Sequence, residues 1–111
     1  MTWQEWFCCV RHDLLKPLLW PARDRRDMGG AVQPGELVVR LVVNGEGQAV
    51  PPQDLWAALQ REAPAPHPGL IHLQTALMRA LRAAQHDDVQ GVLALEAAFD
   101  QLVLELARKD E

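Results

Sequence analysis

The residues that could take part in chemistry gather near the N-terminus, where two cysteines and a histidine lie close together. Cys8 and His12 are four residues apart, and Cys9 and His12 are three apart, so on one helix either pair could share a ligand. Cys–His is also the only conventional nucleophile pair, because the chain contains no serine and no tyrosine. The other histidines form no recognised metal-binding pair with a cysteine or with each other. We therefore expect no metal site, no cofactor and no catalytic residue.

The segment from His12 to Leu18, HDLLKPL, resembles the H-box of sensor histidine kinases, in which a helical histidine followed by an acidic residue accepts a phosphoryl group. Five of its seven positions match the family pattern, namely His12, Asp13, Leu14, Pro17 and Leu18. Leu15 and Lys16 depart from it. The resemblance implies an imidazole nucleophile with a carboxylate beside it. The chain has no Gly-rich nucleotide-binding segment, so kinase activity is not expected. Phosphotransfer through His12 is kept as an alternative, but we expect His12 to be at least partly buried.

The chain has one basic cluster, formed by Arg23, Arg25 and Arg26, with two aspartates between and beside the arginines. Such a cluster could hold phosphate, RNA or an acidic protein surface. The net charge is −4, and residues 87–111 carry seven acidic and two basic side chains. This balance disfavours a general nucleic-acid binder. Nucleic-acid binding through the three arginines remains an alternative, while the expectation is a charged loop or internal pairing with the acidic C-terminal helix.

A helix is expected to position the N-terminal residues. Thr2 and Glu5 have the spacing of a capping box, and apolar side chains then repeat at three- and four-residue steps. Pro17 should kink or end this run, and Pro21 should end the segment. Residues 22–35 are then expected to form a loop, with no more than one helical turn in it.

The clearest strand pattern is ELVVRLVV, residues 36–43, in which β-branched residues alternate with period two. Asn44 to Gly47 supply turn chemistry, and residues 48–50 can return as a second strand with Val50 opposite Leu41. This predicts a β-hairpin over about 36–50. Its open edge would invite pairing with another chain.

Three helices are expected in the second half of the chain. A short one spans about 52–62, after which residues 63–69 form a Pro-rich linker. Two amphipathic helices over about 70–85 and 88–108 are joined by a short turn, which predicts an antiparallel helical hairpin over 70–108. The predicted fold class is α+β, with residues 1–111 as a single domain.

The composition also indicates in which cellular compartment the protein is expected. Apolar residues make up 49% of the 111 residues, but no apolar run approaches the length of a membrane span. The start has no basic segment before an apolar core, so no signal peptide is expected. Adjacent cysteines without an export signal indicate reduced thiols and a cytoplasmic location.

These observations favour a small non-catalytic protein that acts by protein–protein binding, as an accessory, adaptor or regulatory subunit. We expect a protein partner, or self-association with a homodimer favoured, and no membrane partner. The residues expected to bind the partner are Trp3, Arg23, Arg25, Arg26, Val38 and Val42. The residues expected in the core are Trp6, Leu14, Leu41, Trp56, Leu77 and Phe99.

Overall fold

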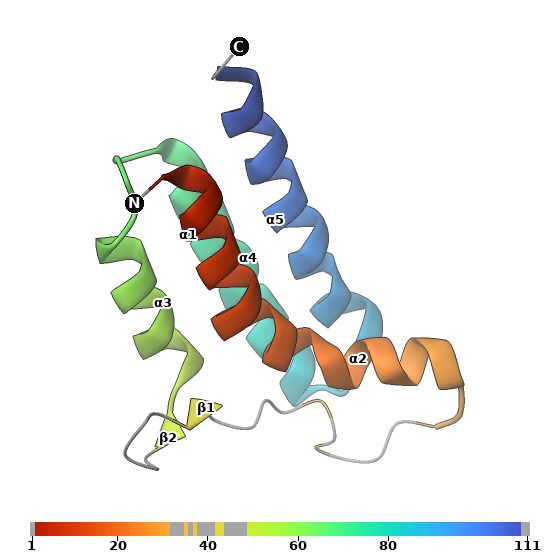
Figure 1. Cartoon of the computed structure of the whole chain (residues 1–111). Coiled ribbons are helices and arrows are strands. Elements are labelled where there is room, and N and C mark those ends of the chain that lie inside the picture. The colour runs from red at the N-terminus through yellow and green to blue at the C-terminus, as the bar shows by residue number, and fades with distance from the viewer. Residues whose placement is uncertain (1, 32–34, 36, 38–41, 44–48, 110–111) are drawn as a thin grey trace.

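The chain folds as a helical protein (Figure 1). The computed structural model describes residues 2–31, 35, 37, 42–43 and 49–109. Its helical elements are α1 (Trp3–Val10), the π-helical turn η1 (Arg11–Leu15), α2 (Lys16–Met28), α3 (Pro52–Arg61), α4 (Pro68–Gln85) and α5 (Val89–Lys109). Two short strands, β1 (Val42–Val43) and β2 (Ala49–Val50), lie between α2 and α3. None of the described helices is both long enough and apolar enough to cross a membrane.

The predicted α+β fold, with a β-hairpin over 36–50, is wrong. In the described part of that stretch, β1 and β2 have two residues each and pair antiparallel, which adds no sheet layer to the helices. Val42 pairs with Val50, where the sequence predicted Leu41 as the partner. Strand preference mostly reflects packing on a half-buried pleated surface. Here the helices bury their apolar faces against one another, and Leu37, between α2 and α3, joins the same core.

The N-terminal helix starts as predicted but does not stop at its prolines. The Glu5 amide donates a hydrogen bond to the Thr2 hydroxyl at 3.2 Å, which caps α1. The helical path then continues through Pro17 and Pro21 to Met28, so the predicted end at Pro21 and the predicted loop after it are wrong. α2 instead ends at Gly29, whose φ of 73° is one that glycine adopts readily.

The π-helical turn η1 explains how the chain tolerates Pro17. Proline has no amide hydrogen, and its ring clashes with the carbonyl four residues earlier in a regular α-helix. Immediately before Pro17, the Lys16 amide donates to the Arg11 carbonyl, five residues back, so the turn is wider. Helices commonly bend at prolines and π turns. Figure 1 shows the change of direction between α1 and α2.

The buried side chains form one apolar cluster that draws on every described helix. Of the predicted core residues, five are at most 3% exposed, namely Trp6, Leu14, Trp56, Leu77 and Phe99, and that prediction is confirmed for them. Leu41 lies outside the described residues. The Trp6 indole Nε1 donates to the Leu59 carbonyl at 2.7 Å, which ties α1 to α3.

The C-terminal helical hairpin is confirmed, and α2 packs against its second helix, α5. α4 begins at Pro68, so the linker is shorter than the predicted 63–69, because proline is favoured at a helix start. The Asp88 carboxylate accepts the Gly91 amide at 3.1 Å and caps α5. A Cβ at Gly91 would lie 2.6 Å from the Ala83 Cβ, so this glycine lets the two helices meet closely at the turn.

Candidate functional site

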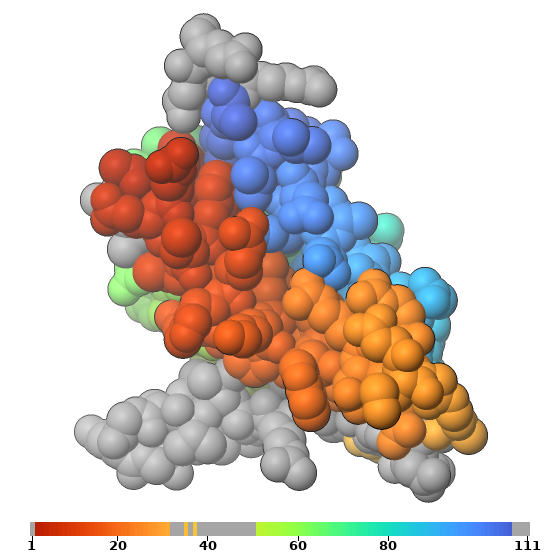
Figure 2. Space-filling model, turned by 45° about the vertical axis from the view of Figure 1, so that its right-hand side comes forward, coloured from red at the N-terminus to blue at the C-terminus, as the bar shows by residue number. Residues whose placement is uncertain are grey.

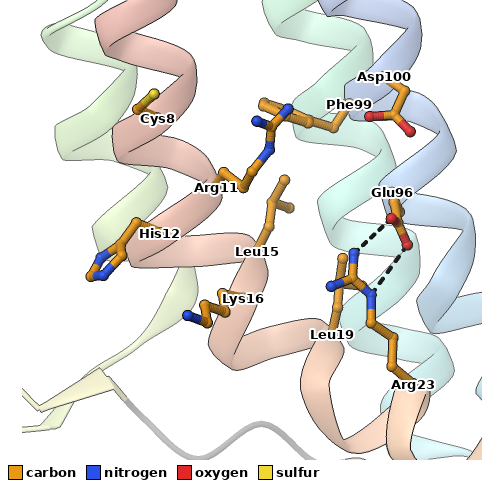
Figure 3. A pocket seen from close by; sticks show the side chains of 10 residues that line it. All are labelled: Cys8, Arg11, His12, Leu15, Lys16, Leu19, Arg23, Glu96, Phe99 and Asp100. Atoms are coloured by element: carbon orange, nitrogen blue, oxygen red, sulfur yellow. Dashed lines mark hydrogen bonds and ion pairs between the residues drawn. The ribbon is translucent and has the colours of Figure 1, made fainter.

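An open groove lies where the N-terminal helices meet α5. Figure 2 shows this face, on which the red and orange atoms of α1, η1 and α2 adjoin the blue atoms of α5. The groove has a volume of about 430 Å³ (Figure 3). Its apolar side chains are Leu15, Leu19 and Phe99, and its other lining residues are Cys8, Arg11, His12, Lys16, Arg23, Glu96 and Asp100. We call it the mixed-charge groove.

The apolar side chains of the mixed-charge groove belong to the core. Leu15, Leu19 and Phe99 are each 3% exposed or less, so they form the floor of the groove between its two walls. The first wall comes largely from η1, where the wider turn supplies Arg11, His12 and Leu15. π turns are often found at functional sites. The two prolines spaced four apart in a helical pattern were the only sequence signal for this feature.

One ion pair joins the two walls. The Arg23 guanidinium contacts the Glu96 carboxylate through Nη2–Oε1 at 2.6 Å and Nε–Oε2 at 3.3 Å (Figure 3). The basic cluster was expected either to form a charged loop or to pair with the C-terminal helix. It lies in helix α2, and Arg23 makes such a pair. Arg26 pairs with its neighbour Asp27 at 3.1 Å, and Arg25 is half-buried. The cluster is thus part of helix α2 and largely engaged within the chain.

Three other charged groups of the groove have no such partner. The Arg11 guanidinium carbon lies 5.2 Å from the centre of the Phe99 ring, a cation–π distance. Within the described residues, Arg11, Lys16 and Asp100 take part in no ion pair, and all three are exposed. The first wall therefore offers two available positive charges, and the α5 wall offers one available negative charge.

His12 stands at the edge of the groove and points into solvent. Its side chain is 79% exposed, and its Nδ1 lies 3.1 Å from Asp13 Oδ1. The prediction that His12 is at least partly buried is therefore wrong. The prediction placed His12 on the same helical face as Leu15 and Leu19, as in a regular α-helix. The wider η1 turn puts the two leucines on the buried face and leaves His12 outside.

The cysteines do not form a chemical centre with His12. Cys8 is exposed and lines the groove, whereas Cys9 is half-buried against the core. In Figure 3 the side chains of Cys8 and His12 point in different directions. Among the described residues, no three His, Cys, Asp or Glu side chains are grouped so that they could hold a metal ion.

Trp3, another partner-binding residue predicted from the sequence, does not line the groove. Trp3 is half-buried, and its ring packs near those of Trp6, Phe7 and His67, with centroid distances of 5.5, 6.0 and 6.3 Å. Val38 and the side chain of Val42 lie outside what the structure describes, so both stay predictions.

A second hollow, of about 350 Å³, lies between α4 and α5 away from the mixed-charge groove. Thr75 and Arg79 line it together with small side chains of α5. Small residues at a helix–helix contact mainly allow close packing, so this hollow follows from the hairpin itself. It provides positions for control substitutions outside the mixed-charge groove.

Comparisons with protein-family models, with curated proteins and with solved structures found no match. The role of these residues is therefore argued from the geometry and charge of the mixed-charge groove.

Proposed function

We propose that this chain is a non-catalytic protein-binding module, an accessory or regulatory subunit whose partner docks in the mixed-charge groove. The observation that carries the proposal is the set of charged groups around an apolar floor that lack an ion-pair partner within the described chain: Arg11, Lys16 and Asp100. Protein interfaces typically combine a dry apolar centre with a polar rim, and complementary charges on the rim guide association.

The interior of the groove suits binding better than catalysis. Its thiol and imidazole point apart, and its one close ion pair, Arg23–Glu96, joins the two walls. Arginine near an aromatic ring, as Arg11 is near Phe99, is also common at interface hot spots.

The exposed thiol of Cys8 permits a direct test. A photo-crosslinker attached to Cys8 in a Cys9→Ala background should join the chain to a partner in extracts of its own cells. The same reagent at Thr75→Cys, in a chain that also carries Cys8→Ala and Cys9→Ala, is the positional control. Lys16→Glu should abolish the Cys8 product, whereas Arg79→Glu, a matched charge reversal in the other hollow, should leave it unchanged. Identical products from both positions, or no product from either, would contradict the proposal.

A second candidate function, histidine phosphotransfer, is favoured by the exposure of His12. A carboxylate can only accept, so Asp13 holds the proton on Nδ1 and leaves the Nε2 lone pair free toward solvent. Nε2 would attack the phosphorus of an acyl phosphate, the bond to the donor carboxylate would break, and that carboxylate would leave with the electron pair. Asp13 would stabilise the positive charge that develops on the ring.

Incubation with acetyl phosphate, followed by intact-mass measurement at neutral pH, tests this candidate. The wild type should gain one phosphoryl group, His12→Gln should gain none, and Asp13→Asn should react more slowly. His86→Gln, at an exposed histidine after α4, is the matched control and should behave as the wild type. Phosphorylation that persists in His12→Gln, or none in the wild type, would rule the candidate out.

A further inference from the structure

We infer that the occupant of the mixed-charge groove is a second copy of this chain, in a twofold dimer. This inference rests on the proposed function and names the partner. A twofold interface brings the same surface of both copies together, so that surface must be complementary to itself. The groove meets this condition because its walls carry opposite available charges, Arg11 and Lys16 on one side and Asp100 on the other.

The same helix that forms the acidic wall also carries the apolar group that the groove needs. Leu104 is 57% exposed and lies one helical turn after Asp100. This face of α5 therefore presents an apolar side chain beside a carboxylate. Its complement is apolar surface beside a cation. The floor is at most 3% exposed, so the alkyl stems of the exposed Arg11 and Lys16 supply that surface at the rim.

Other kinds of partner fit the groove less well. A purely acidic segment would meet Asp100, and a purely basic segment would meet Arg11 and Lys16, with repulsion in either case. A twofold axis beside α5 places Asp100 of each copy against the basic wall of the other, and both contacts form at once. Arg23 and Glu96 need no partner, because they already neutralise each other within one chain.

A charge-swap experiment tests the dimer. Sedimentation equilibrium of the purified chain, at concentrations up to about 100 μM, should give twice the chain mass of 12.4 kDa. Arg11→Glu and Asp100→Arg should each raise the dimer dissociation constant at least about tenfold. The double variant Arg11→Glu/Asp100→Arg should restore dimerisation, since it exchanges the charges and keeps their attraction. Leu104→Ala should weaken the dimer, and Arg79→Glu should not.

The inference would be overturned by a wild type that stays monomeric, by charge reversals that leave the dissociation constant unchanged, or by a double variant that is no better than either single variant. Far-ultraviolet circular dichroism of each variant shows whether it is folded, and restored dimerisation in the double variant excludes misfolding as the cause. A monomeric wild type that still forms the Lys16-dependent crosslink to another protein would contradict the dimer but support the proposed function.

Discussion

Truncation of Phe99 to alanine should be the most destabilising change at the groove, because this ring belongs to both the core and the site. Phe99 is 1% exposed, and its ring lies edge-on to Phe7 with centroids 5.7 Å apart. Deleting a buried phenylalanine ring typically costs about 3–5 kcal/mol. The aromatic pair contributes about 0.5–1.5 kcal/mol of this and the Arg11 cation–π contact about 0.5–1 kcal/mol.

A series of variants separates these contributions. Phe99→Leu keeps most of the apolar volume and loses both ring interactions, so it should cost about 1–2.5 kcal/mol. Arg11→Gln should cost about 0.5–1 kcal/mol in the wild type and nothing in the Phe99→Leu background. Urea unfolding followed by far-ultraviolet circular dichroism gives each free energy. A loss below about 1 kcal/mol for Phe99→Ala would mean that α5 does not pack on the N-terminal helices as described.

Two further predictions concern hydrogen bonds in the core and at a helix cap. Trp6→Phe should cost about 1–3 kcal/mol more than Trp56→Phe in urea unfolding, because Trp6 Nε1 donates to the Leu59 carbonyl whereas the buried Trp56 Nε1 has no partner among the described residues; equal costs would contradict this. His67 Nδ1 accepts the Gly69 amide at 2.9 Å and caps α4, so His67→Ala should lower the free energy of unfolding by about 1 kcal/mol and His67→Asp should recover most of it. Alanine and aspartate variants of equal stability would show that the cap contributes nothing.

The helices of the second half were predictable because their signals are local. Pro52 occupies the first turn of a helix, Asp88 caps another, and the apolar spacing of α4 and α5 marks their buried faces. Pro68, which begins α4, was assigned to the linker instead. Each of these features depends on neighbours within a few residues along the chain. The predicted bounds of α3, α4 and α5 are therefore close to those observed.

The errors arose where distant contacts or unusual turns decide the structure. The alternation in residues 36–43 predicted a long strand, but a strand needs a partner surface, and the helices use their apolar faces on each other. Pro21 ends a regular helix by local rules, yet α2 continues past it and packs on α5. The prediction that His12 is buried was wrong because it assumed a regular α-helix, whereas His12 lies in the wider η1 turn.

The candidate site was beyond local reasoning because the chain brings it together from both ends. Arg23 and Glu96 are far apart in the sequence and meet at 2.6 Å across the groove. The sequence left open whether the arginine cluster forms a charged loop or pairs with the acidic helix. It could not indicate which arginine pairs, nor that Arg11, Lys16 and Asp100 would stay available beside an apolar floor.

The rate at which the Cys8 thiol reacts with an alkylating reagent tests the central claim most directly, because Cys8 lines the mixed-charge groove and is exposed in the single chain. Peptide-level mass spectrometry compares the assembled protein with the dissociated chain, and Thr75→Cys reports on the other hollow. If a protein docks in the groove, assembly slows alkylation of Cys8 at least about tenfold and leaves that of the cysteine at position 75 unchanged. Equal alkylation of Cys8 in the assembled and dissociated states would place the interface elsewhere and contradict the account.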